Sequence, residues 1–358
     1  MKSFFRIDWL LLAPVLVLIT ISLITLFSIN VEFFRSQLLS LVIAVVAFLF
    51  FSRIDIDFLK QHILPIYIIS LVLLSILFLI GIESRGAVRW IDIFGVRLQF
   101  SEVLKPFLSV AFAAFLTGSS YSKRKSFLLS LAFLLPVVLL ITLQPDLGSG
   151  LIYAFVAGFT LLVAGYPLLW FGFLLTPVVI ASPFAWMMLH DYQKQRVMTF
   201  LNPASDPLGT SYNSIQAIIA VGSGTFFGKG WLQGTQSTLR FLPEKHTDFI
   251  FATISEGLGF VGATFLVLTF VFLCYRVYVI YQNSQDSFTK VFAVCGFGFF
   301  LIQGFVNIGM NVGYLPIVGV TLPFVSFGGS SLLSNFIFLG LLSGLSIDQK
   351  KKHVLEIR

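Results

Sequence analysis

The sequence alternates long apolar runs with shorter polar stretches. A run of roughly 17 to 25 apolar residues is long enough to cross a bilayer as one helix. Segments 147–190 and 291–347 are each long enough for two such helices, and 249–275 supplies one more. Single helices are predicted over the charge-free runs 9–31, 36–52, 63–82, 106–122 and 126–145. The pattern predicts an all-α integral membrane protein, one polytopic domain over residues 1–358 with about ten transmembrane helices.

Glycine and proline interrupt two of the apolar runs. The turn GYP at 165–167 is expected to separate the two helices of 147–190, and MNVGYLPIVGVTLP at 310–323 those of 291–347. Non-helical backbone at membrane depth is tolerated only where protein buries it or where it lines a wet cavity. The stretch PFVSFGGSS at 323–331 also indicates close backbone approach. A functional cavity and ordinary helix packing are both open explanations of these two stretches.

Composition agrees with a membrane location. The chain is 57% hydrophobic and 11% charged, whereas soluble domains carry about 25% charged residues. The first apolar run is not followed by a small-residue cleavage site, so it is expected to remain as a helix. Cys274 and Cys295 both fall inside predicted helices. We therefore expect them to be packing residues rather than partners in a disulfide or a metal site.

Positive charge sets the expected orientation. With an even number of helices both termini share one side, and Lys and Arg near the helix ends mark that side as cytoplasmic. The residues that carry this signal are Lys2, Arg6, Arg53, Lys60, Lys123, Arg124, Lys125, Arg276, Lys290 and the QKKK tail. Two longer loops, about 83–105 and 191–248, then lie on the outer face, the second between helices seven and eight. The net charge of +7 suits anionic headgroups or anionic substrates, and no nucleic-acid partner is expected.

The first outer loop is compact and rich in charge. Glu102 and Lys105 are three residues apart, so they share a face if the next helix has begun there, and they can pair. Such a pair could be only an interface anchor. Because a charge-free helix follows Lys105 directly, its ammonium is expected to face protein or water rather than lipid. The same loop also carries Arg89, Trp90 and Arg97.

The second outer loop contains the glycine-rich stretch VGSGTFFGKGWLQGTQS at 221–237. Its glycines permit backbone approach to a ligand, but the spacing is not that of a Walker motif, so nucleotide binding is not indicated. Positive charge in this loop comes from Arg196, Lys229, Arg240 and Lys245.

FLPEKHTDFIFATISEGLG at 241–259 places two acids at a helix entrance. On a helix Glu256 lies roughly 80° round and about 12 Å deeper than Asp248, so both acids could open into one cavity. Glu256 then needs a partner such as a basic side chain from another helix. Asp248 is explained either as a helix cap or as a base that takes a proton from a hydroxyl nucleophile while cations hold a diphosphate leaving group. His246 is a second titrating group, a metal ligand or a hydrogen-bonded surface residue.

Several stretches together resemble the SEDS (shape, elongation, division, sporulation) family over nearly the whole chain. They are GAVRWIDIFGVRLQFSEVLK, QPDLGSG at 144–150, GKGWLQGTQSTLRF, LPEKHTDFIFA and LPFVSFGGSS. GTQS followed by FLPE-x-HTDF is more similar to the rod-shape branch of the family than to its division branch. The resemblance implies ten membrane helices, cytoplasmic termini and a large outer loop between helices seven and eight.

The resemblance also implies an activity at the outer face of the bacterial cytoplasmic membrane. Members polymerise lipid II into glycan strands during cell-wall growth, together with a class B penicillin-binding protein, the cross-linking transpeptidase, and other elongation-complex proteins. Asp248 takes the position of the family's essential aspartate and is expected to be the general base, while undecaprenyl diphosphate leaves with inversion. The substrate-binding residues are then Arg89, Trp90, Arg97, Glu102, Lys105, Arg196, Lys229, Lys245 and His246. No residue is assigned to a metal, and a cofactor such as Mg²⁺ or Mn²⁺ stays open, with Glu102 orienting Lys105 or helping to hold the ion.

Two positions depart from the family pattern. The family usually reads Q-P-S-E or Q-P-A-E where this chain has QFSE at 99–102, so Phe100 replaces a proline, and Glu256 is followed by Gly257 rather than by a second acid. Two other classes of function compete with the enzyme. A lipid II flippase would also need charged outer residues and glycine-broken helices, and a scaffold would only recruit the penicillin-binding protein. The enzyme is favoured because the charged residues gather at one membrane face.

Overall fold

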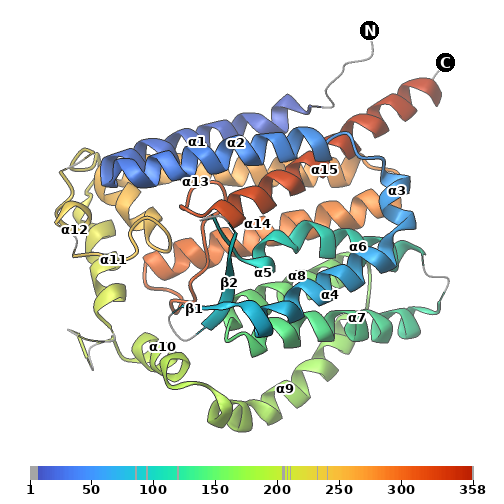
Figure 1. Cartoon of the computed structure of the whole chain (residues 1–358), viewed down its shortest axis with the longest axis horizontal. Coiled ribbons are helices and arrows are strands. Elements are labelled where there is room, and N and C mark those ends of the chain that lie inside the picture. The colour runs from blue at the N-terminus through green and yellow to red at the C-terminus, as the bar shows by residue number, and fades with distance from the viewer. Residues whose placement is uncertain are drawn as a thin grey trace.

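The computed structural model describes residues 7–356, apart from 85–86, 94–95, 119–120, 204–205, 208, 210, 232 and 240. The chain forms a bundle of long helices that run side by side (Figure 1). Helix α1 (Trp9–Ile29) begins and α15 (Gly329–Glu356) ends at the same end of this bundle. This is the arrangement that an even number of crossings predicts.

The helices fall on the predicted apolar runs. Within the described residues, six are long and apolar enough to cross a membrane, namely α1, α2 (Val31–Phe51), α7 (Lys123–Leu143), α13 (Ile250–Asn283), α14 (Ser287–Asn311) and α15. Shorter apolar helices are α4 (Ile63–Ile80), α6 (Lys105–Gly118), α8 (Leu147–Val163) and α9 (Leu168–Met188). The turn at 165–167 separates α8 from α9 as predicted. The helical membrane architecture is thus confirmed, and the number of ten crossings stays a prediction.

Two glycines let α15 pack directly on α2. A Cβ at Gly340 would lie 2.8 Å from the carbonyl oxygen of Phe48, and one at Gly344 would lie 2.7 Å from that of Ser52. Cβ atoms essentially never come within 3.0 Å of such an atom. Small residues four apart commonly allow membrane helices this close an approach.

Gly344→Leu is expected to destabilise the protein by about 1–3 kcal/mol, because the new side chain must push α15 away from the backbone of α2. The measurement is the midpoint of thermal unfolding in detergent. Gly172→Leu is the matched control, since nothing lies within 4 Å of a Cβ at Gly172 on α9. Equal shifts for the two variants would contradict the proposed packing.

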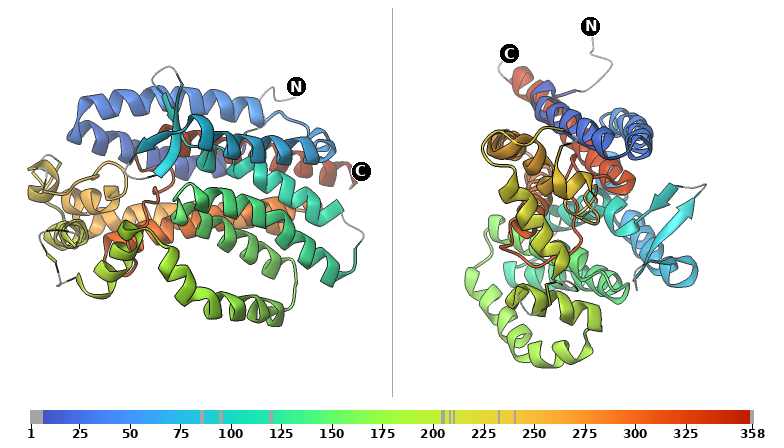
Figure 2. Two further views of the ribbon diagram at one scale, coloured as in Figure 1. Left: turned by 60° about the horizontal axis from the view of Figure 1, so that its bottom comes forward. Right: turned by 90° about the vertical axis from the view of Figure 1, so that its left-hand side faces the viewer.

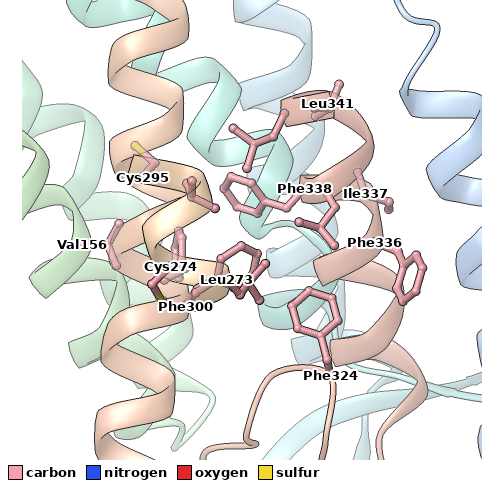
Figure 3. Packing of buried hydrophobic residues seen from close by; sticks show 14 of the residues in the cluster. Val156, Leu273, Cys274, Cys295, Phe300, Phe324, Phe336, Ile337, Phe338 and Leu341 are labelled. Carbon is pink, nitrogen blue, oxygen red and sulfur yellow. The ribbon is translucent and has the colours of Figure 1, made fainter. Parts of the chain in front are cut away.

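Aromatic side chains fill the core between α14 and α15 (Figure 3). The ring centroid of Phe300 lies 5.5 Å from that of Phe324 and 6.0 Å from that of Phe338, distances at which aromatic rings attract one another. Cys274 and Cys295 are buried members of the same core and form no disulfide. Both are packing residues, as predicted.

The first outer loop folds into a small sheet that the sequence did not predict. Its strands β1 (Ile82–Ser84), β2 (Ala87–Ile93) and β3 (Val96–Leu98) are antiparallel and in the order β1-β2-β3, and α5 (Phe100–Val103) follows. Asp92 lies opposite Arg97 in the register, a favourable combination of charges across strands. The sheet stands to one side of the helices (Figure 2). Three-residue strands give too short a period-2 pattern to be found in the sequence.

The second outer loop is also more ordered than predicted. It contains α10 (Asp191–Leu201), α11 (Tyr212–Ser223) and the single turn α12 (Thr235–Thr238). Helices α9 and α10 lie at the periphery of the bundle in both figures that show the whole chain.

At the other end of the bundle a salt bridge ties the short helix α3 (Ile56–Gln61) to α14. Lys60 Nζ lies 3.1 Å from Oδ1 of Asp286, the N-cap of α14. Burial acts to raise the pKa of Asp286, but hydrogen bonds from Thr289 and Lys60 outweigh it and leave this pKa below its ordinary value.

Candidate active site

The linker between α14 and α15, residues 312–328, joins the parts of the candidate site. A Cβ at Gly319 would lie 3.7 Å from Oδ2 of Asp248, and one at Gly148 would lie 2.7 Å from the carbonyl oxygen of Val318. The linker therefore passes beside Asp248 and beside the first turn of α8. In a membrane protein, the polar groups of irregular backbone inside the helix bundle must be satisfied within the protein.

Side chains from two helices bind part of that backbone, and a linker side chain adds a third hydrogen bond. Ser22 of α1 donates a hydrogen bond to the Val325 carbonyl (2.6 Å). Gln37 of α2 donates to the Ser326 carbonyl (3.3 Å), and Ser326 itself donates through its hydroxyl to the Thr247 carbonyl (2.7 Å). The linker is thus fixed to the bundle on one side and to the residue before Asp248 on the other.

Asp248 lies just outside α13, and two buried asparagines hold its backbone. The side-chain amides of Asn307 and Asn311 donate to the Asp248 carbonyl at 3.1 and 2.9 Å. Asn311 Oδ1 also accepts the amide hydrogen of Ala252 (3.0 Å). In a regular helix this amide would bond to the Asp248 carbonyl, so the two asparagines take the place of that hydrogen bond. Phe249, not Asp248, is the N-cap residue of α13. Asp248 therefore lies one residue before the cap position of α13, and its half-buried carboxylate is oriented from the backbone side.

Asn307→Leu is expected to cost about 1–3 kcal/mol, because it leaves the buried carbonyl of Val320 without its donor and removes one of the two amides that bind the Asp248 carbonyl. Thermal unfolding in detergent measures this loss. Gln303→Leu, one helical turn away, is the control: the Gln303 side chain is buried, and neither of its amide atoms has a hydrogen-bond partner among the described residues. A destabilisation by Gln303→Leu as large as that by Asn307→Leu would contradict the role given to Asn307.

A buried ion pair lies at the entrance of α6. Lys105 Nζ is 2.6 Å from Oε1 of Glu102, and the two side chains are 1% and 11% exposed. The predicted pairing is confirmed, and the Lys105 ammonium faces protein, 5.8 Å from the centre of the Phe299 ring. Within the described residues Oε2 of Glu102 has no hydrogen-bond partner. A buried carboxylate oxygen without a donor is costly and is a place where a polar ligand group is stabilised.

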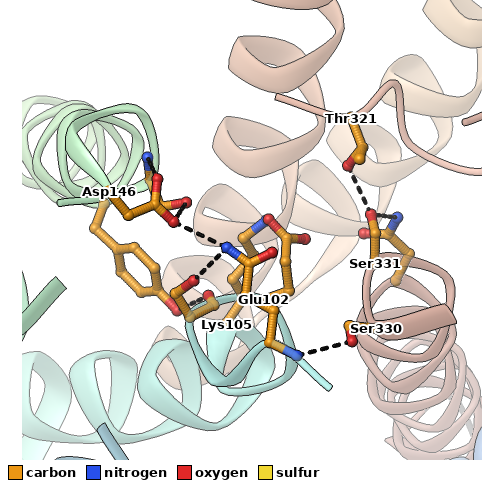
Figure 4. Close-up of polar contacts among 11 residues, drawn as sticks. Glu102, Lys105, Asp146, Thr321, Ser330 and Ser331 are labelled. Carbon is orange, nitrogen blue, oxygen red and sulfur yellow. Dashed lines mark hydrogen bonds and ion pairs between the residues drawn. The ribbon is translucent and has the colours of Figure 1, made fainter. Parts of the chain in front are cut away.

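A second acid, Asp146, lies in the same cluster (Figure 4). It is the N-cap of α8, and its carboxylate accepts hydrogen bonds from Gln99 Nε2 (2.8 Å) and from the Ser149 amide and hydroxyl (3.2 and 2.8 Å). Tyr153 donates to the Ser101 carbonyl (2.8 Å) and closes the cluster from α8. Sequence reasoning did not select Asp146. Its signal was the acid three residues before a serine at a helix start.

The cluster does not form a ready metal site. Mg²⁺ requires near-octahedral oxygen coordination, but Glu102 is paired with Lys105, and Asp146 is occupied by Gln99 and Ser149. No group of three or more His, Cys, Asp or Glu side chains that could hold a metal occurs in the described part of the chain.

The sheet brings other predicted residues toward this cluster. Ser330 of α15 accepts the amide hydrogen of Gln99 (3.0 Å) and donates to the Arg97 carbonyl (3.3 Å). The Arg97 side chain is exposed on β3, and Trp90 is half-buried on β2. Arg89 also belongs to β2, but its side chain lies outside the described residues.

Arg196 lines a separate cavity of about 300 Å³. Its walls come from α10, α11 and the linker, with Thr199, Ser214, Ile218 and Pro316 among the lining residues. The cavity combines one guanidinium with hydroxyl and apolar groups.

Of the remaining candidates, Lys229 precedes α12 in the chain, and Lys245 and His246 lie between α12 and Asp248. Lys245 Nζ donates to the Ser237 carbonyl, and Lys229 Nζ lies 3.5 Å from Oε1 of Glu256. The His246 ring stacks on Phe33 of α2 at a centroid distance of 4.1 Å. Glu256 is fully buried, so the expectation that it shares an open cavity with Asp248 is wrong. Its basic partner comes from a loop.

The glycine-rich stretch likewise differs from its interpretation as a ligand-binding loop. A Cβ at Gly224 would lie 2.0 Å from the Ser255 carbonyl oxygen, and one at Gly228 would lie 2.2 Å from that of Gly257. The close backbone approach that these glycines permit is to α13. The sequence correctly predicted that these glycines permit a close backbone approach, but it predicted a ligand as the partner instead of α13.

Comparison with known proteins identifies the family. The family model described as cell cycle protein, FtsW/RodA/SpoVE, matches residues 1–352. The chain belongs to the SEDS family. A relative from Escherichia coli K12, peptidoglycan glycosyltransferase MrdB, is 41% identical over 80% of this chain and 78% of its own length. A probable peptidoglycan glycosyltransferase FtsW from Hydrogenovibrio crunogenus is 32% identical over 98% of this chain and 94% of its own.

Solved structures agree with this membership of the SEDS family. A structure of a peptidoglycan synthase complex that coordinates polymerization and crosslinking superposes with a TM-score of 0.83 at 27% identity, covering 96% of this chain and 98% of the other. The rod shape determining protein RodA of Thermus thermophilus gives a TM-score of 0.74 at 26% identity over 96% and 97%. The similarity to the rod-shape branch that the sequence indicated is confirmed.

Proposed function

We propose that this chain is a peptidoglycan glycosyltransferase that polymerises lipid II at the outer face of the cytoplasmic membrane during cell elongation, with Asp248 as general base. The names of its relatives MrdB and FtsW support the activity. The observation that carries the proposal is the linker 312–328, because it lies against Asp248 on one side and against the start of α8, next to Asp146, on the other.

The geometry suits transfer from a lipid-linked diphosphate. Asp248 would take the proton from the acceptor sugar hydroxyl as that oxygen bonds to the anomeric carbon of the growing strand. The bond from that carbon to the diphosphate oxygen breaks on the opposite face, so undecaprenyl diphosphate leaves and the configuration inverts. Fixed cations near the leaving group stabilise its charge most when water is excluded. Lys105, which is buried, and the partly exposed Lys229 and Lys245 are the proposed cations.

The position of the site follows from the expected orientation. Both termini are proposed to be cytoplasmic, which places the sheet, α10 to α12 and Asp248 outside. The structural relative that is a peptidoglycan synthase complex supports a class B penicillin-binding protein as partner. Other elongation-complex proteins remain expected partners.

A lipid II flippase is the second candidate. One observation favours it: Asn311, Asn307 and Gln303 are spaced four residues apart on α14 and are all fully buried, so polar groups continue below Asp248. A transport path requires such groups across the whole membrane. The asparagines, however, bind backbone carbonyls, so of these three residues only Gln303 keeps amide atoms without a hydrogen-bond partner among the described residues.

Polymerisation in detergent separates these two functions. The purified chain, with its penicillin-binding partner and the transpeptidase blocked by penicillin, is incubated with lipid II, and glycan is resolved by length. A detergent solution has no compartments, so a transporter produces no signal. We expect glycan. Absence of glycan together with faster lipid II translocation in proteoliposomes that contain the chain would replace the enzyme by the flippase.

A further inference from the structure

Helix α13 is broken at Gly259, about three turns after Asp248, and the glycine-rich stretch fills the break. Gly259 has φ 67° and ψ −165°, outside the helical region. Backbone groups that the break frees are taken by residues 225–230. The hydrogen bonds run from the amide of Lys229 to the carbonyl of Glu256 (3.0 Å), Gly230 to Gly257 (2.9 Å), Phe260 to Thr225 (2.9 Å) and Val261 to Phe226 (3.1 Å).

The Glu256 side chain hydrogen-bonds to residues 235–237, the next part of the same loop. It is fully buried. Its Oε1 accepts the amide hydrogen of Gln236 (2.9 Å) and the Thr235 hydroxyl (3.3 Å), and its Oε2 accepts the amide hydrogen of Ser237 (2.9 Å). Lys229 adds a longer contact of 3.5 Å. Charge-assisted bonds of this kind are the strong ones in a low-dielectric interior, so one carboxylate determines where α12 lies.

Helix α12 in turn positions the segment that contains Asp248. Leu242 donates its amide hydrogen to the Gln236 carbonyl (3.1 Å), and Lys245 Nζ donates to the Ser237 carbonyl. Two contacts thus connect Glu256 to the residues just before Asp248.

Lys229 has a different relation to Glu256. Its side chain is 31% exposed, whereas that of Glu256 is 0% exposed. Two backbone amides and a hydroxyl hydrogen-bond Glu256 without it. The ammonium can therefore turn to an anionic ligand without leaving a buried carboxylate unpaired, which would be strongly unfavourable.

We propose that Glu256 is a positioning residue of the polymerase: it anchors residues 225–245 on the broken helix, sets Asp248 against the acceptor hydroxyl and presents Lys229 to the diphosphate. This inference rests on the proposed glycosyltransferase function. Glu256 touches no reacting atom and acts only through α12 and Lys229. The lone acid at this position is sufficient for the role, because no contact of the anchor requires a second carboxylate at residue 257.

The test is Glu256→Gln in the purified chain with its partner. The amide keeps the shape and one acceptor but loses the charge and the acceptor for Ser237. Misplacement of a catalytic group by about 1 Å costs on the order of 100-fold in rate. We expect kcat for glycan formation to fall by about that factor. Amide hydrogen exchange is expected to rise within 224–245 and to stay unchanged in α14 and α15. Thr235→Val, which removes one hydroxyl from the anchor, should have a much smaller effect on both.

Three results would overturn the inference. They are an unchanged rate in Glu256→Gln, a lost rate with unchanged exchange in 224–245, and a rise of exchange throughout the bundle, which would indicate global destabilisation. Failure of the proposed function is distinguishable, because the wild type would then make no glycan at all while the exchange comparison still reports whether Glu256 anchors the loop.

Discussion

Asp248→Asn is expected to abolish glycan formation while leaving the fold intact. The amide cannot accept the proton of the acceptor hydroxyl, and general base catalysis typically contributes about 10²–10⁴-fold in rate. Asparagine has nearly the same shape, and the contacts of Asn307 and Asn311 are made to the backbone of residue 248, so thermal unfolding should be unchanged. Initial rates of lipid II polymerisation measure the effect.

Glu244→Gln is the matched control for this prediction. Glu244 lies four residues earlier in the same segment and is likewise half-buried, and its carboxylate accepts the Thr247 hydroxyl (3.0 Å). If loss of any carboxylate near the linker lowered the rate equally, the general base could not be assigned to Asp248. Asp248→Glu should retain part of the rate, because glutamate supplies the same carboxylate base, although one methylene further from the backbone.

Lys105→Met is expected to destabilise the protein by about 3–5 kcal/mol, because it leaves Glu102 as a buried charge without its partner. The ion pair is 2.6 Å long and nearly closed to solvent. The double variant Glu102→Gln/Lys105→Met should recover most of this stability, because removing both charges can be close to neutral. Thermal unfolding in detergent of the two single variants and the double variant measures the coupling.

The polymerisation kinetics of the double variant distinguish a structural role of Lys105 from a role in binding the diphosphate. If its ammonium binds the diphosphate, the stable double variant still polymerises slowly and with a raised KM. A double variant with wild-type kinetics would show that the pair serves folding alone. A single variant Lys105→Met as stable as the wild type would contradict the burial of the pair.

The helices were predictable because each apolar run is close to the thickness of a bilayer. The split of 147–190 at its GYP turn and the pairing of Glu102 with Lys105 followed from local chemistry, in which glycine and proline end a helix and opposite charges three apart meet. These are features that neighbouring residues determine.

Features that depend on distant residues were missed. Asn307 and Asn311 are separated from Asp248 by about 60 positions, and a buried amide in an apolar helix gives no sign of which carbonyl it binds. Gly224 and Gly228 fit closely against α13, yet in the sequence they look like a ligand loop. Gln99 reaches Asp146 across 47 positions, and the local helix-start signal of Asp146 does not show that it belongs to this cluster.

The most direct measurement is the stoichiometry of the reaction. Wild-type chain and Asp248→Asn, each with the penicillin-binding partner, are incubated with lipid II in detergent, and glycosidic bonds and released undecaprenyl diphosphate are counted in the same samples. A glycosyltransferase with Asp248 as its base predicts one released diphosphate for each bond in the wild type and neither product in the variant. Glycan and released diphosphate at wild-type levels from Asp248→Asn would contradict it.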